Sequence, residues 1–313
     1  MLATSLNGVV GHSLLIVGLV TSVFGAISLG YATITGDRKL LRAAPNYAWV
    51  VGATAVAALL VMLRALLTYD FELDYVQRVG SRTTPTLYNV TALWSALQGS
   101  ILLWLAVLAG YTVIIMRRYR KRLDDPLVAW ALVTMFVVAA FFFFLAFGPT
   151  DVFKPGAAGV TDGPGPNPLL QNHVLVLFHP PILYLGYVGF TVPFAFAIGA
   201  LVTGRVGEGW LLETRRWALI AWGFLSVGIV LGGWWSYEVL GWSGVWAWDP
   251  VENASFLPWL TATAYIHSVL VQERRGMLRV WNISLLVATF ALTILGTFLT
   301  RSGVVNSVHA FSD

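Results

Sequence analysis

The sequence has 313 residues, of which 58% are hydrophobic and only 11% carry a formal charge. This balance excludes an ordinary soluble domain and is typical of a chain that crosses a membrane several times. The absence of cysteine excludes structural disulfides and thiol chemistry by the chain's own residues. The net charge of +4 does not indicate nucleic-acid binding, because its distribution between the apolar segments accounts for it. The sequence therefore predicts an all-α polytopic membrane protein.

Apolar runs of about twenty residues recur along the chain, and each is long enough for one transmembrane helix. The first is too long for the core of a signal peptide and has no basic leader, so we expect it to be retained as a helix. No internal repeat or low-complexity tract divides the sequence, and we expect a single domain over residues 1–313. The eight predicted spans are 7–31, 46–67, 90–116, 126–147, 174–203, 216–233, 253–272 and 280–300.

Basic residues predict the orientation of these spans, because Lys and Arg accumulate in cytoplasmic loops. Fourteen of the nineteen Lys and Arg residues lie in four loops that alternate correctly with the spans. The pattern predicts that these loops face the cytoplasm and that both ends of the sequence lie outside. The four basic loops are 36–43, 117–125, 204–216 and 273–279.

The same topology places three connecting segments and a tail outside. Segment 68–89 is polar, and segment 148–173 is rich in glycine and proline and is expected to form an extended cover. The third segment, 232–260, lies between the sixth and seventh spans, and the tail covers residues 301–313. Small residues in the fifth and sixth spans predict close helix contacts; they are Gly186, Gly189, Gly223, Gly228, Gly232 and Gly233.

Segment 232–260 holds six of the fourteen tryptophans of the chain. They are Trp234, Trp235, Trp242, Trp246, Trp248 and Trp259. An aromatic belt at the membrane surface would explain scattered indoles, but the density of this cluster favours a specific platform. Asp249 is expected to cap a helix that starts at Pro250, with Glu252 completing a capping box.

Two histidines are expected on the outer side, close to the tryptophans. His179 is followed by two prolines in LFHPPILYLGY, which predicts an irregular or newly started helix that presents the ring outward. His309 lies in the tail, whose apolar neighbours predict that it rests on the protein or the membrane. A local hydrogen bond for His179, or simple solvation for His309, is the alternative role.

The other three histidines differ in their expected surroundings. His267 falls well inside the seventh span, about 20 Å of helix beyond Ala254, so it is expected in the hydrocarbon region. It either bonds a neighbouring helix or acts as a ligand. His12 and His173 lie near the outer ends of spans and are expected to be structural or solvated. His173 remains a candidate ligand because it is close to His179 in the sequence.

External histidines beside a plate of tryptophans suggest heme, a flat apolar macrocycle whose iron takes two axial imidazoles. Indoles can cover its faces and edges, and an arginine can pair with its propionates. Arg301 is the first candidate for that pairing, together with Arg78 and Arg82. The sequence contains no HExxH zinc pattern, no glycine-rich phosphate loop and no defensible Ser-His-Asp set.

The run GWSGVWAWDPVENASFLPWL is similar to the WWD signature of heme-handling membrane proteins. Together with FHPPILYLGYVGF, LGGWW, the IHS element and LGTFLTRSGVVNSVHAF, it resembles the CcmF/NrfE family of cytochrome c-type biogenesis proteins. The matching stretches run through the whole chain. The family commonly has Gly, Trp and Phe where this sequence has Ser243, Val245 and Ala247, which predicts a roomier platform.

This resemblance implies a cytochrome c heme lyase in a bacterial inner membrane, alone or in a complex, with heme b bound at the periplasmic face. The implied iron ligands there are His179 in FHPP and His309 in VHAF. His267 matches one ligand of a second heme b within the membrane, whose partner histidine belongs to a later span. The family protein is much longer, so we expect a split or truncated form. The outer site would also include Trp234, Trp235, Trp242, Trp246, Trp248, Asp249 and Arg301.

The implied reaction joins the two heme vinyl groups to the thiols of a Cys-x-x-Cys-His segment in apocytochrome c. The implied partners are the heme chaperone CcmE, apocytochrome c, maturation subunits of the CcmH/CcmI type and the lipid bilayer, with no nucleic acid. Two other interpretations remain open. One is heme transport or delivery of the CcmC or CcsA type without ligation, and the other is a docking subunit that binds no heme.

Overall fold

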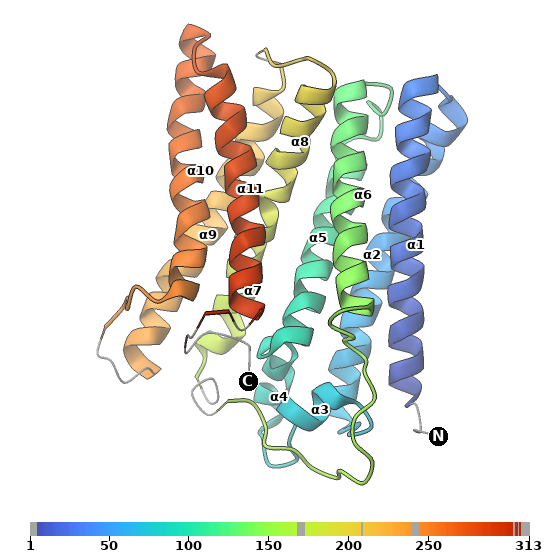
Figure 1. Cartoon of the computed structure of the whole chain (residues 1–313), viewed down its shortest axis with the longest axis vertical. Coiled ribbons are helices and arrows are strands. Elements are labelled where there is room, and N and C mark those ends of the chain that lie inside the picture. The colour runs from blue at the N-terminus through green and yellow to red at the C-terminus, as the bar shows by residue number, and fades with distance from the viewer. Residues whose placement is uncertain are drawn as a thin grey trace.

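The computed structural model describes residues 5–167, 173–207, 209–239, 244–302, 304–305 and 307. Its long helices run side by side in one bundle (Figure 1). The helices are α1 (Leu6–Thr35), α2 (Arg38–Leu67), α3 (Asp74–Val79), α4 (Thr86–Thr91), the 3-10 helix η1 (Ala92–Trp94), α5 (Leu97–Tyr119), α6 (Pro126–Phe147), α7 (Leu175–Gly189), α8 (Thr191–Val202), α9 (Leu211–Val239), α10 (Pro250–Arg275) and α11 (Arg279–Arg301).

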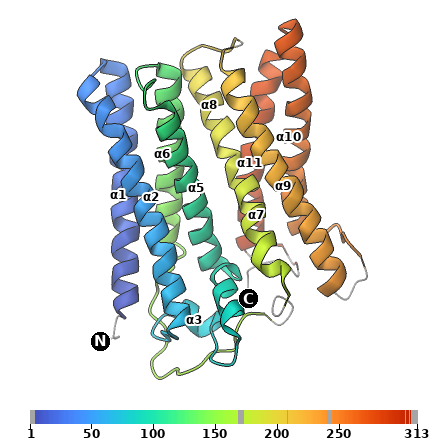
Figure 2. The ribbon, with the colours of Figure 1, turned by 180° about the vertical axis from the view of Figure 1, so that it is seen from behind.

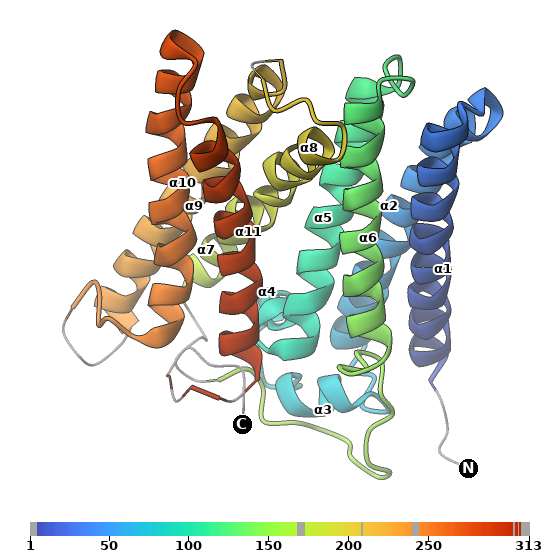
Figure 3. The same ribbon diagram turned by 45° about the horizontal axis from the view of Figure 1, so that its top comes forward.

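Eight segments of the described chain are long and apolar enough to span a membrane, which confirms the predicted polytopic fold. α7 and α8 together form one of them, and the others belong to α1, α2, α5, α6, α9, α10 and α11. The connections between α1 and α2, α5 and α6, and α10 and α11 lie at one end of the bundle, whereas α3 and α4 lie at the other (Figures 1 and 3). These three basic connections therefore lie at the same end of the bundle, as the alternation predicted.

The first basic loop is much shorter than predicted, because α2 begins at Arg38 and not at residue 46. The carboxylate of Asp37 caps this helix by accepting the backbone N–H of Lys39 at 2.8 Å. Gly36 ends α1 in a left-handed conformation with φ 73°, which glycine adopts without steric cost. The turn needs only these two residues, so the basic side chains belong to the first turns of α2.

The prolines of the FHPP motif lie inside α7, so the predicted irregular start at His179 was wrong. α7 begins four residues before His179 and continues through both prolines. Pro180 lacks the N–H that would bond the carbonyl of Val176, and the indole Nε1 of Trp94 donates to that carbonyl at 2.9 Å instead. The interruption comes later, at Phe190 between α7 and α8.

The predicted extended cover, 148–173, contains no helix in its described part up to residue 167. Figure 2 shows this connection between α6 and α7 crossing the end of the bundle beside α3. The side-chain amide of Gln77 donates to the carbonyl of Ala157 at 2.7 Å and accepts its backbone N–H at 3.0 Å. Nε2 of His12 lies 2.7 Å from a carboxylate oxygen of Asp151, which agrees with the structural role predicted for His12.

Small residues let α7 and α9 pack closely, and this contact positions the site described below. A Cβ at Gly186 would lie 2.2 Å from the backbone nitrogen of Leu225, and one at Gly228 would lie 2.8 Å from Cα of Leu183. Four of the six predicted glycines make such contacts between helices, Gly233 instead approaches the carbonyl of Val245 before α10, and nothing lies within 4 Å of a Cβ at Gly223. The prediction for Gly223 was wrong because that side of α9 has no neighbour so close.

We expect Gly186→Ala to lower the free energy of unfolding by about 2 kcal/mol, since backbone atoms of α9 cannot yield as a flexible side chain would. Gly223→Ala is the matched control, and it should leave stability unchanged or slightly higher because alanine favours a helix. Thermal unfolding in detergent, followed by circular dichroism, measures both. Equal melting temperatures for the two variants would contradict the close contact.

Candidate functional site

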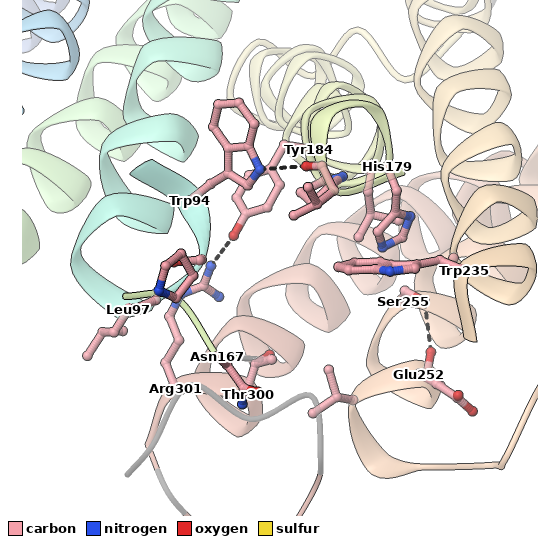
Figure 4. A pocket seen from close by; sticks show the side chains of 18 of the residues that line it. Trp94, Leu97, Asn167, His179, Tyr184, Trp235, Glu252, Ser255, Thr300 and Arg301 are labelled. Carbon is pink, nitrogen blue, oxygen red and sulfur yellow. Dashed lines mark hydrogen bonds between the residues drawn. The ribbon is translucent and has the colours of Figure 1, made fainter. Parts of the chain in front are cut away.

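A cavity of about 650 Å³ lies at the end of the bundle that carries α3 and α4. Its walls come from α3, α5, α7, α9, α10 and α11, and from the connection at 164–167. Figure 4 shows His179 and Trp235 on one side of this cavity, and Arg301 with Tyr184 on another. The fold thus places an imidazole and an indole in the same cavity as a guanidinium from the far end of the sequence.

His179 is held against α9 by ring nitrogen Nδ1, which lies 2.8 Å from the carbonyl oxygen of Gly228. Because a carbonyl only accepts, Nδ1 carries the hydrogen, and the lone pair of the neutral ring lies on Nε2. The ring fits because of Gly232, where a Cβ would come within 2.7 Å of the imidazole Cε1. This tautomer is the one in which Nε2 can bind a metal.

Trp235 lies on the last turns of α9, in contact with two histidines, and lines the cavity. Its indole meets the His179 ring with centroids 5.7 Å apart and planes inclined by 61°. It stacks on His173 with centroids 6.4 Å apart and planes inclined by 15°. Its buried indole N–H has no hydrogen-bond partner among the residues described. An acceptor group on a bound molecule would satisfy this donor.

Two further tryptophans lie just before α10, and one of them lines the cavity. Trp246 forms part of the cavity wall and packs edge-on against Phe256, with centroids 5.7 Å apart. Trp248 is 68% exposed and meets Trp246 edge-on at 6.2 Å. The predicted site residue Trp242 lies outside the described residues.

Trp234 belongs to a helix and not to the predicted external loop, whereas Trp259 lies in the helix that was predicted to start at Pro250. α9 extends to Val239, so Trp234 lies on its last turns, where it is 55% exposed and lines a second cavity of about 460 Å³. Trp259 lies in α10 and donates from Nε1 to the hydroxyl of Ser226 at 2.8 Å. The expected single plate of indoles is divided between a cavity wall, an exposed helix surface and a contact between helices.

The predicted capping box at the start of α10 is confirmed. Oδ1 of Asp249 accepts the backbone N–H of Val251 at 2.8 Å, and the Glu252 carboxylate accepts the backbone N–H of Asp249 at 3.2 Å. The same Asp249 oxygen also accepts the hydroxyl of Ser307 at 2.6 Å. At this residue the tail therefore contacts the protein, as expected. His309, two residues farther along, lies outside the described residues.

Arg301 is the last residue of α11 and lines the cavity. Its guanidinium donates to the hydroxyl of Ser100 from two nitrogens, at 3.3 Å and 3.1 Å, and to the hydroxyl of Tyr184. Arg78 lines the same cavity and forms an ion pair with Asp74 at 2.8 Å. Two of the three arginines considered for an anionic ligand thus reach the cavity.

Arg82, the third arginine, contacts the extended cover and does not line the cavity. Its guanidinium donates to the carbonyl of Thr161 at 3.1 Å and lies 5.1 Å from the ring centroid of Tyr69. Its backbone N–H and that of Gly163 donate to Asp162 and hold the pKa of that carboxyl below its usual value. These contacts explain why Arg82 fixes a loop and does not reach the site.

His267 lies on α10 and is exposed at the outside of the bundle. Its Nδ1 is 2.8 Å from the carbonyl oxygen of Thr263, so the lone pair of the neutral ring lies on Nε2. It lines neither cavity and lies about 25 Å of helix beyond Pro250. The described chain contains no cluster of three or more His, Cys, Asp or Glu side chains that could hold a metal ion. A ligand role for His267 stays a prediction.

Several side chains of the cavity wall were not identified by the sequence analysis. Leu183 and Tyr187 follow His179 by four and eight residues, a spacing that puts all three on one face of α7 and was visible in the sequence. Trp94 and Gln98 gave no comparable signal. They reach the cavity from η1 and α5, whose position depends on tertiary contacts.

Comparison with known proteins settles the family. A family model described as cytochrome C assembly protein matches residues 94–305. The chain belongs to this family. Over 303 residues it is 42% identical to the cytochrome c-type biogenesis protein CcmF of Pseudomonas aeruginosa, and the match covers 96% of the chain and 46% of that relative. With CcmF of Escherichia coli the identity is 40% over 304 residues, covering 97% of the chain and 47% of the relative.

A solved structure of the cytochrome c heme lyase CcmF has the same fold. It superposes with a TM-score of 0.81 at 41% identity, covering 96% of this chain and 48% of that chain. The resemblance stated from the motifs is therefore confirmed, and the protein is a multi-pass membrane protein of the bacterial CcmF type. The chain spans about half the length of the curated relatives it matches.

The double use of the Asp249 carboxylate leads to a stability prediction. Asp249→Ala should cost about 1 kcal/mol of unfolding free energy, because it removes the helix cap together with the Ser307 contact. Asp249→Asn keeps a capping oxygen and should lose much less. Thermal unfolding in detergent compares the two variants, and a loss that is the same in both would show that the cap is not the cause.

Proposed function

We propose that the 650 Å³ cavity receives heme as a substrate and that the protein joins it to apocytochrome c, as a heme lyase of the CcmF type. The observation that carries the proposal is the His179 imidazole at the cavity wall, whose Nδ1–H is fixed on the Gly228 carbonyl, so that the ring is in the tautomer with its lone pair on Nε2. A hydrogen bond from the other ring nitrogen to a carbonyl is typical of histidines that bind metals.

The lining of the cavity suits an amphipathic macrocycle. Its volume falls within the range of about 300–1,000 Å³ that is common for small-molecule sites. Trp235 and Trp246 offer apolar surfaces for the porphyrin, while Arg301 and Arg78 offer positive charge for its carboxylates. The buried N–H of Trp235 adds a donor for a polar group of the ligand. We infer that the propionates lie toward Arg301.

We assign the second axial position to His309. Two residues of extended chain reach at most about 7 Å, and the described Ser307 is bonded to Asp249 beside Trp248. The tail therefore approaches the segment that carries the tryptophans. Trp242 is assigned to the platform by the same family resemblance. Trp234 and Trp248 face outward, so we give them a role at the rim.

The proposed reaction adds each thiol S–H of a Cys-x-x-Cys-His segment across one heme vinyl C=C bond. Sulfur bonds one carbon and hydrogen goes to the other, so nothing leaves and there is no net oxidation. The chain has no cysteine, which fits thiols supplied by the substrate. A histidine of apocytochrome c would replace one axial ligand and hold the cysteines near the vinyl groups, so proximity is the main contribution of the protein.

The family resemblance also supports proposals for the membrane location, the partner proteins and a second heme. We propose that residues 1–313 act as one heme-handling domain, with the cavity at the periplasmic face of a bacterial inner membrane. CcmE would supply heme, and CcmH/CcmI-type subunits would present apocytochrome c. His267 would be one ligand, through Nε2, of a heme b within the membrane. That heme would supply electrons that keep the iron of the substrate heme reduced. His267 faces outward, so the second ligand would come from a neighbouring chain or segment.

One prediction of the proposed function concerns the iron ligands. The purified protein, loaded with heme, should show a low-spin bis-histidine absorption spectrum, and His179→Ala or His309→Ala should each abolish that spectrum. His12→Ala is the control, since His12 bonds Asp151 away from the cavity. An unchanged spectrum in both variants would rule out the ligand assignment. Heme binding without thioether formation on an apocytochrome peptide would favour a delivery protein.

Another prediction of the proposed function concerns the charged end of the cavity. Arg301→Gln should weaken heme binding by about tenfold, because it removes one charge-assisted pair with a propionate. The loss should disappear when heme dimethyl ester, which has no free carboxylates, replaces heme in the same titration. Arg82→Gln should bind heme like the wild type. Equal losses for heme and its ester would show that Arg301 acts only through packing.

A further inference from the structure

His173 lies beside the cavity without lining it, and the proposed function gives it no role. Its Nδ1 accepts the backbone N–H of Leu175 at 3.2 Å, so the hydrogen of the neutral ring is on Nε2. That nitrogen lies 2.6 Å from Oε2 of Glu238 and donates to it. One ring nitrogen is thus fixed by the start of α7 and the other by the end of α9.

Glu238 is itself fixed by two donors. Its Oε1 accepts the indole N–H of Trp234, one turn earlier on α9, while Oε2 accepts His173. The Glu238 side chain is 42% exposed and that of His173 is 18% exposed. Water therefore screens the electrostatic attraction between the two side chains, but the directional hydrogen bond between them remains. With both oxygens engaged, the carboxylate can hold the His173 ring in one plane.

The plane of His173 matters because Trp235 lies on it. The planes of His173 and Trp235 are nearly parallel, inclined by 15°, whereas the His179 ring meets Trp235 edge-on, at 61°. Trp235 therefore contacts both a structural histidine and the candidate iron ligand. The His173 ring, held by Glu238, therefore presents a fixed face to the Trp235 indole.

We propose that His173, oriented by Glu238, is a positioning residue that fixes Trp235 against His179 in the heme-binding cavity. This inference rests on the proposed function, since the ligand that benefits is heme bound through His179. His173 contacts neither the porphyrin nor the iron in this assignment. Its effect passes through Trp235, which sets the packing surface for the porphyrin and restricts the orientation of the His179 ring.

The test uses the protein purified from its membrane in detergent and titrated with ferric heme. His173→Phe keeps a flat ring for stacking but loses both nitrogen contacts, and Glu238→Ala removes the acceptor. We expect each variant to bind heme about tenfold more weakly, with a shifted low-spin electron paramagnetic resonance signal because the His179 ring changes orientation. His12→Phe removes a histidine–carboxylate contact of the same kind elsewhere and should change neither property.

Double-variant cycles separate positioning from general stability. If His173 acts through Glu238 and Trp235, the loss in His173→Phe should be largely absent in a Glu238→Ala or a Trp235→Phe background. His173→Gln keeps a donor for Glu238 but no ring, so it should retain the normal melting temperature and still shift the resonance signal. Additive losses, or wild-type affinity and signal in these variants, would overturn the positioning role while leaving the heme site intact. A wild-type protein without heme binding would overturn the proposed function and this inference together.

Discussion

The close approach of α7 to α9 determines how the site is built. Gly186 and Gly228 bring the two backbones together, and the same approach places the carbonyl of Gly228 within hydrogen-bonding distance of His179. A bulkier residue at either glycine would separate the helices, so the imidazole would lose the acceptor that sets its tautomer. Tight packing between helices and the tautomer of the His179 ring are thus linked through the same pair of helices.

Polar groups in this bundle are satisfied in ways that also shape the cavity. Pro180 leaves a carbonyl without its helical donor, and Trp94 supplies one from a different helix. That bond ties η1 to α7 and brings Trp94 into the cavity wall. In an apolar environment an unsatisfied carbonyl is costly, so this donor stabilises the helix at Pro180. At Pro180 the helix that holds His179 is thus supported by a donor distant in sequence.

The sequence was a good guide where one local rule decides the outcome, and a poor one where tertiary contacts decide it. Apolar length predicted the spans, and the spacing of Asp249 and Glu252 predicted the capping box at α10. The prolines after His179 suggested an irregular helix, but the rule omits a donor such as Trp94. Likewise, the density of tryptophans suggested one plate, whereas helical geometry turns Trp234 outward and Trp235 into the cavity. Adjacent positions on a helix point about 100° apart, which no count of aromatic residues takes into account.

The Asp249 carboxylate connects two parts of the proposed site that are far apart in sequence. It caps α10, where the helix N-terminus favours negative charge, and it also accepts the hydroxyl of Ser307 in the tail. A loss of the cap would therefore loosen the tail, and a loss of the tail contact would leave the cap in place. Because the capping interaction holds Asp249 in one orientation, the tail meets a fixed acceptor and not a mobile side chain. The approach of the tail to the tryptophan-rich segment is thus determined by the start of the helix that follows that segment.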